Sequence, residues 1–120
     1  MTLLNDFFFI RQEENIPGSV KAKISINPQH KIFDSHFPGK PVVPGVCMVQ
    51  IIIELMEKVM LKKVRLRKAD SIKFLAVMNP TDNDEIDVTI NYSVEENNLL
   101  VSAKLFSGPV IFFKFNAMFS

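Results

Sequence analysis

A helical segment that is apolar on almost every side constrains the fold most. Residues 46–60 contain no glycine or proline, and between Val46 and Met56 only Gln50 and Glu54 are polar. A helix on the surface of a domain shows a polar face over about half of its circumference. This segment must therefore be surrounded by other elements, and a curved sheet wrapped around one central helix does this.

Gln50 and Glu54 lie four residues apart, so they share one face of this helix about one turn from each other. Two interpretations of this polar strip stay open. Either the strip points toward solvent where the surrounding sheet is open, or it lines a functional site.

Most of the remaining chain has the pattern of antiparallel strands. Residues 20–26 alternate between apolar and polar side chains, as in a strand buried on one face. Similar runs predict further strands around residues 7–11 and over 71–78, 86–94, 99–106 and 110–119, with turns at 96–98 and 107–109. Three prolines and two glycines in residues 30–45 predict a loop without regular structure. This order predicts an α+β fold with one helix against a meander-like sheet.

Length and composition predict one soluble domain over residues 1–120, without a signal peptide or a membrane span, in the cytoplasm. The net charge of +1 gives no electrostatic case for nucleic acid. Cys47 is the only cysteine, so it is either a core residue or a thiol activated in the first helical turn. The two histidines and this cysteine lack the spacing of metal ligands, so no metal is expected.

The loop before the helix, His36 to Val46, has the features of a chemical site. Its prolines stiffen the chain, and Gly45 lets another group approach the backbone closely. The first N–H groups of the following helix have no internal partners and carry partial positive charge, so they can bind an oxyanion or a carbonyl oxygen. His36 can act as a base near neutral pH. The alternative is a rigid capping loop with an incidental surface histidine.

The motif His-Phe-Pro-Gly-x-Pro-x-x-Pro-Gly-Val, read from His36 to Val46, resembles the signature of the bacterial 3-hydroxyacyl-[acyl carrier protein] dehydratases. The residues Lys68–Phe74 and Asn79–Asp82 are loosely similar to the family's strand and turn after the helix. The resemblance implies a hot-dog fold, in which an antiparallel sheet wraps around one central α-helix. It also implies a homodimer, or a dimer-based oligomer, with two sites at the interface and an acyl chain in a narrow tunnel.

The resemblance also implies the roles of individual residues. The family's catalytic histidine corresponds to His36, and the amide that polarises the thioester carbonyl corresponds to Gly45. The substrate-binding residues that it implies are Phe37, Pro38, Gly39, Pro44, Gly45 and Val46. No separate cofactor is implied, because the substrate is carried on the phosphopantetheine of acyl carrier protein or coenzyme A.

One catalytic position departs from the family. The family's catalytic carboxylate lies five residues after the glycine, where this chain has Gln50. An amide can hydrogen-bond a hydroxyl, but it cannot donate a proton as a carboxylic acid does. Family members often carry Gln one turn after the catalytic Glu, so Gln50 and Glu54 look exchanged. Both stay candidates for the group that acts on the substrate hydroxyl.

A cluster of basic residues follows the helix: Lys58, Lys62, Lys63, Arg65, Arg67 and Lys68. It is either a solvated helix end, where cations suit the helix dipole, or a docking patch for an acidic acyl carrier protein. Nucleic acid is disfavoured, because the cluster has no interleaved aromatic residue.

The resemblance implies a (3R)-hydroxyacyl-[acyl carrier protein] dehydratase-like protein that acts on an acyl thioester in fatty-acid or related acyl-chain biosynthesis. Two alternatives stay open. One is a catalytically weak or inactive subunit that binds acyl thioesters, and the other is a thioesterase on the same fold.

Overall fold

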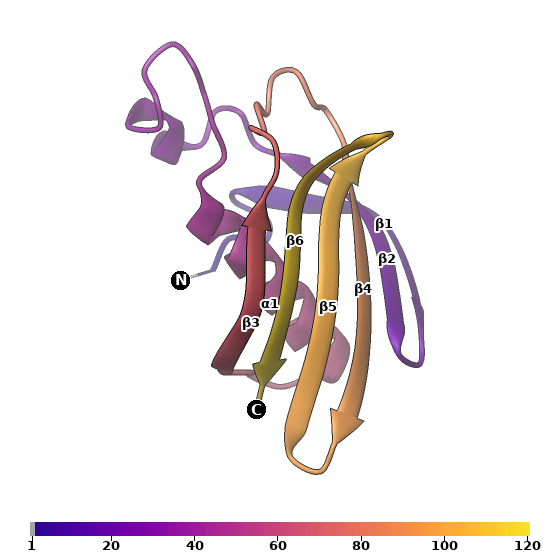
Figure 1. The fold of residues 1–120 in the computed structure, drawn as a ribbon. Coiled ribbons are helices and arrows are strands. Elements are labelled where there is room, and N and C mark those ends of the chain that lie inside the picture. The colour runs from indigo at the N-terminus through magenta and orange to yellow at the C-terminus, as the bar shows by residue number, and fades with distance from the viewer. Residues whose placement is uncertain (1) are drawn as a thin grey trace.

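The computed structural model describes residues 2–120 and contains a six-stranded antiparallel sheet with one long helix on one of its faces (Figure 1). The order of the strands across the sheet is β1-β2-β4-β5-β6-β3. The elements follow one another along the chain as β1 (Phe8–Ile16), β2 (Ser19–Ile26), the short 3-10 helix η1 (Lys31–Asp34), α1 (Gly45–Met60), β3 (Leu66–Phe74), β4 (Ile86–Glu95), β5 (Asn98–Ser107) and β6 (Val110–Phe119).

The buried face of the sheet follows from the alternating sequence. In β2, Val20, Ala22, Ile24 and Ile26 are buried, and the polar residues between them point to the other face. The inner sides of β4, β5 and β6 pack against the apolar residues of α1 in the same core. The structure confirms the α+β architecture, the central helix and the strands predicted near both ends of the chain.

The prediction for residues 71–78 was wrong at both ends, because the strand there is β3, Leu66–Phe74. This strand lies at the edge of the sheet and pairs only with β6, so most of its side chains stay exposed on both faces. No alternation therefore marks its charged first half. After Leu75 the chain leaves the sheet and brings Met78 into the core, where its carbonyl accepts a 2.9 Å hydrogen bond from the Val43 N–H.

The expectation of no regular structure in residues 30–45 was also wrong in part, because η1 lies within it. The ring Nδ1 of His30 accepts a hydrogen bond from the Ile32 N–H and caps this short helix. Together, η1 and the loop that follows it lie at the end of the molecule opposite the β4–β5 hairpin (Figure 1). This loop carries His36.

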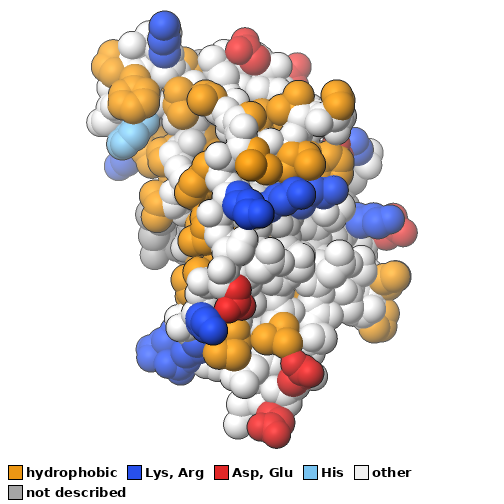
Figure 2. Space-filling view, viewed as in Figure 1, with side chains coloured by type: hydrophobic (Ala, Val, Ile, Leu, Met, Phe, Trp, Pro, Cys, Tyr) orange, Lys and Arg blue, Asp and Glu red, His pale blue; other side chains and the backbone are white. Residues whose placement is uncertain are grey.

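The β3 edge exposes a cluster of apolar side chains. Ile72, Phe74, Leu75 and Val77 are all exposed, and Phe74 retains 55% of its accessible surface. In Figure 2, hydrophobic side chains gather along the side of the molecule where β3 lies. A contiguous apolar patch beside an unpaired strand edge is typical of an interaction surface. Among residues 2–120, no helix has the length and apolar character needed to cross a membrane.

Candidate functional site

Helix α1 begins without a side-chain cap. Pro44 occupies the N-cap position and no side chain caps the first turn. The Cys47 and Met48 N–H groups bond to the Pro44 carbonyl at 3.0 and 3.3 Å. The N–H groups of Gly45 and Val46, which precede them, have no carbonyl within the helix to bond to. The start of α1 therefore offers two amide donors of the kind that polarise a carbonyl oxygen.

The ring of Phe74 lies directly against Gly45. A Cβ atom at position 45 would lie 2.7 Å from Cζ of Phe74, closer than packed atoms approach. The same ring stacks on Phe113 with a centroid distance of 5.3 Å. Gly45 is thus required for this contact, and Phe74 stands beside the candidate carbonyl site. No pattern in the sequence marks Phe74 as a site residue, since an apolar residue in a strand does not indicate which loop it will contact.

His36 is held by its backbone and presents its side chain to the surface. Its N–H donates to the Ile32 carbonyl at 3.2 Å, and its carbonyl accepts from the Val42 N–H at 2.9 Å. The imidazole is exposed and lies near the ring of Phe37, with a centroid distance of 5.5 Å. Loop residues Phe37, Pro38 and Gly39 and helix residue Val46 are also exposed, whereas Pro44 and Gly45 are half-buried.

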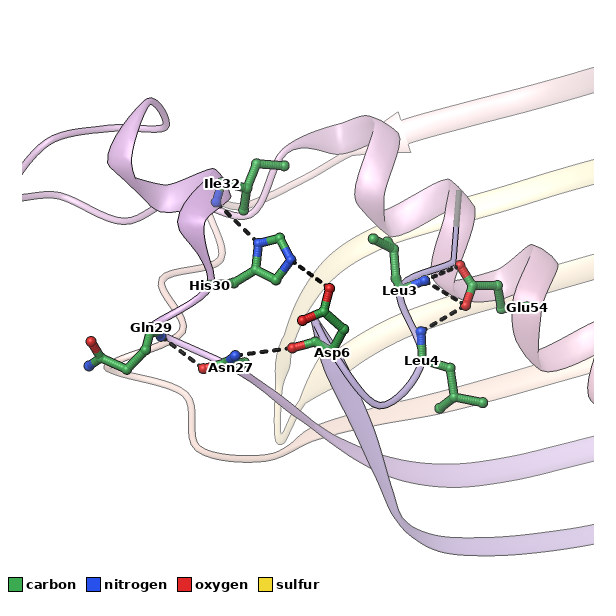
Figure 3. A network of polar contacts seen from close by, with 8 residues as sticks. All are labelled: Leu3, Leu4, Asp6, Asn27, Gln29, His30, Ile32 and Glu54. Carbon is green, nitrogen blue, oxygen red and sulfur yellow. Dashed lines mark hydrogen bonds and ion pairs between the residues drawn. The ribbon is translucent and has the colours of Figure 1, made fainter.

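The two polar residues of the helix strip are hydrogen-bonded to each other. Nε2 of Gln50 donates to Oε2 of Glu54 at 2.9 Å. Glu54 is buried, with 7% of its surface exposed, and its carboxylate also accepts hydrogen bonds from the backbone N–H groups of Leu3 and Leu4 (Figure 3). The strip is therefore not an open solvent face at Glu54, because residues 3 and 4 cover it.

Gln50 lines a hollow of about 610 Å³ at the molecular surface. Ile53 and Glu57 line it from the helix. Lys63 and Arg65 line it from the segment between α1 and β3, and Arg67 lines it from β3 itself. The hollow thus places three members of the basic cluster next to Gln50. An anionic group bound there would lie beside the candidate site.

Cys47 belongs to the core. Its side chain is fully buried, and burial raises the pKa of the thiol. A raised pKa disfavours the thiolate, which is the nucleophilic form. The structure therefore favours the core interpretation of Cys47 over the activated-thiol interpretation.

A single long helix that follows a proline- and glycine-rich loop and packs on one face of an antiparallel sheet defines a hot-dog protein. Solved structures with the same fold include a chain of the dehydratase heterocomplex ApeI:P from Xenorhabdus doucetiae, with a TM-score of 0.75, 15% identity, and coverage of 92% of this chain and 96% of that one. The (R)-hydratase from A. caviae involved in PHA biosynthesis superposes with a TM-score of 0.54 at 14% identity, covering 79% and 72% of the two chains.

The chain belongs to the family of ApeI-like dehydratases, whose sequence pattern it matches over residues 11–107. It is also similar to the 3-hydroxyacyl-[acyl-carrier-protein] dehydratases FabZ of Ligilactobacillus salivarius and Lactobacillus helveticus, each at 33% identity. These alignments cover 67% and 69% of this chain. They span 63% and 62% of the relatives' own lengths.

Proposed function

We propose that this protein is a dehydratase of (3R)-hydroxyacyl thioesters, carried on the phosphopantetheine of acyl carrier protein or coenzyme A, in fatty-acid or related acyl-chain biosynthesis. The observation that carries the proposal is the uncapped start of α1 directly after the loop that holds His36. A base and a carbonyl-polarising pair of amides are the two parts that this elimination needs first. The cytoplasmic location stays a prediction.

The proposed reaction uses these parts in order. The Gly45 N–H polarises the thioester carbonyl and makes the C2 proton acidic. The imidazole of His36 takes that proton, the C2–C3 double bond forms, and the C3–O bond breaks. The proton held by His36 is then available to the leaving hydroxyl, which departs as water. Gln50 hydrogen-bonds the hydroxyl and orients it, without supplying a proton.

A turnover assay with three substrate classes tests this function. A 3-hydroxyacyl thioester should lose water to give the 2-enoyl thioester, which is detected by the absorbance of the conjugated product. The 2-enoyl thioester should show the reverse hydration. Release of free thiol from a simple acyl thioester, without dehydration, would identify a thioesterase and reject the proposal.

A second candidate is an acyl-thioester-binding subunit with little catalysis of its own. Gln50 favours it, because a missing general acid costs about 10²–10⁴ in rate. One structure that shares this fold comes from a dehydratase heterocomplex. In this second candidate, a different partner chain would supply the carboxylate that this chain lacks at position 50. Tight binding of a 3-hydroxyacyl thioester without turnover would support this candidate.

We expect the isolated protein to form a dimer through the β3 edge. Pairing two such edges would continue the sheet and bury the exposed apolar side chains of Ile72 and Phe74. Sedimentation at micromolar concentration should give twice the chain mass of 13.7 kDa. Ile72→Lys should shift the protein to monomer, because it places a charge on the apolar edge. A wild-type monomer at these concentrations would contradict the homodimer.

We propose that acyl carrier protein docks on the basic side of the hollow next to Gln50. Within the basic cluster, Lys58, Lys63 and Lys68 already have carboxylate partners, namely Glu13 at 2.8 Å, Glu57 at 3.9 Å and Asp70 at 3.4 Å. Lys62 lies outside the hollow that Gln50 lines, whereas Arg65 and Arg67 line it. These two arginines are therefore the best placed to meet an acidic partner.

Arg65→Glu with Arg67→Glu should raise KM for a carrier-bound substrate about 10-fold or more, since an acidic partner is no longer attracted. The KM for the same acyl group on coenzyme A should change much less. The matched control reverses two charges elsewhere, in Lys104→Glu with Lys114→Glu. These lysines are register partners on the neighbouring strands β5 and β6. An equal loss in both variants would reject docking at the arginines.

A further inference from the structure

Glu54 is the one buried charged side chain among residues 2–120. A carboxylate removed from water needs several hydrogen-bond donors to offset its lost hydration. The proposed dehydration does not use Glu54 directly. Its burial and its partners therefore call for a separate explanation.

The partners of Glu54 are mostly backbone groups from a distant part of the chain. The Leu3 N–H is shared between Oε1 and Oε2 at 2.9 and 2.8 Å, and the Leu4 N–H donates to Oε1 at 2.8 Å. Charge-assisted bonds of this kind are stronger than bonds between neutral groups. Together with Gln50, these donors engage both carboxylate oxygens.

This geometry fixes which way the Gln50 amide points. An ionised carboxylate only accepts hydrogen bonds, so the Gln50 atom that faces Glu54 must be the nitrogen Nε2. The carbonyl oxygen of that amide is turned away from Glu54. If Glu54 were an amide as well, its contact with Gln50 would be satisfied by either orientation of the Gln50 amide, so this contact would no longer select one of them.

The segment that Glu54 holds also reaches the turn before His36. The Asp6 carboxylate contacts Nε2 of His30 at 3.2 Å, and the Asp6 carbonyl accepts from Nδ2 of Asn27 at 3.0 Å (Figure 3). Phe7 stacks on Phe33 of η1 with a centroid distance of 5.6 Å. Residues 3–7 thus connect the helix that carries Gln50 with the short helix that precedes His36.

We propose that Glu54 is a positioning residue, which anchors the segment of residues 3 and 4 on α1 and thereby fixes the orientation of the Gln50 amide. The inference rests on the proposed function insofar as Gln50 orients the substrate hydroxyl. Glu54 then influences turnover only through Gln50 and does not touch the substrate.

A double-mutant cycle tests this dependence. Glu54→Gln should lower kcat for dehydration about 10-fold or more, since a misplaced orienting group is costly, with a smaller change in KM. In a Gln50→Ala background the same substitution should change kcat less than about twofold, because the residue through which it acts is gone. An equal loss of kcat in both backgrounds would overturn the inference and make Glu54 a catalytic group.

A spectroscopic measurement tests the positioning role of Glu54 independently of dehydratase activity. The side-chain amide signal of Gln50, recognised by its absence from the Gln50→Ala spectrum, should show slow solvent exchange in the wild type and about 10-fold faster exchange in Glu54→Gln. Unchanged exchange would reject the inference. Faster exchange in a wild-type protein without any turnover would keep the positioning role and reject the dehydratase.

Two further variants complete the design. Asp87→Asn makes the same change from carboxylate to amide at a hydrogen-bonded position on β4, where Asp87 pairs with Lys23 at 3.0 Å. It should leave the exchange of the Gln50 amide unaltered, and an equal effect there would count against a specific link. If Glu54→Gln fails to fold, Glu54→Asp keeps the charge, and its shorter side chain should still release Gln50.

Discussion

Replacing His36 with alanine should reduce dehydration of a 3-hydroxyacyl thioester by about 10²–10⁴, because the base that takes the C2 proton is removed. The free energy of unfolding should change by no more than about 0.5 kcal/mol, since the imidazole is exposed and its truncation opens no cavity. Steady-state turnover and urea unfolding measure the two effects on the same preparation.

The second histidine provides the matched control. His30 caps η1 through its ring nitrogen, and asparagine is a good substitute at that position. His30→Asn should therefore keep turnover close to the wild-type value. Normal turnover in His36→Ala would show that His36 is not the base and that the residue roles implied by the family do not apply to this chain.

Gln50→Glu should raise dehydration by about 10-fold or more, because it returns a carboxyl group to the position where the resemblance implies one. The structure adds a reason. The new carboxyl group would lie beside the Glu54 carboxylate, where Nε2 now donates at 2.9 Å. Two carboxyl groups at such a distance share one proton. The protonated partner could then supply a proton to the leaving hydroxyl.

The same variant should cost stability at neutral pH, since a donor to Glu54 is replaced by a second acid. Because the folded pair would bind more protons than the unfolded chain, stability should rise as the pH falls toward the range where free carboxyl groups protonate. Gln50→Met is the control for shape without polarity and should show no gain in turnover. Unchanged turnover in Gln50→Glu would indicate that the hydroxyl group of the substrate does not lie beside residue 50.

Patterns of apolar residues predicted most of the fold. The alternation of Val20, Ala22, Ile24 and Ile26 predicts a strand that is buried on one face, and the nearly all-apolar α1 predicts a helix that packs in the core. Strand β3 was misplaced because an edge strand exposes both faces in the single chain and shows no such pattern. The sequence therefore predicts the elements that are buried within the single chain, but not the bounds of a strand that the single chain leaves exposed.

Of the candidate site, the sequence predicts only the part that lies in a recognisable motif. The loop from His36 to Gly45 was found by its prolines and glycines and by the family resemblance. The binding of Glu54 to the N–H groups of Leu3 and Leu4 was missed, because no side-chain pattern records a bond to the backbone of residues about fifty positions away. The same limit hid the contact between Phe74 and Gly45.

The unpaired β3 edge has a consequence for handling the protein. Lys68 and Lys73 place charges along this strand, and charged side chains on a free edge slow its association with other edges. The apolar residues between and beyond these two lysines favour association of the edge instead. When this protein is synthesised in excess over the chain that pairs with its β3 edge, we therefore expect it to aggregate first through β3. If the pairing chain is a different protein, soluble yield in recombinant expression should rise when that chain is produced together with this one.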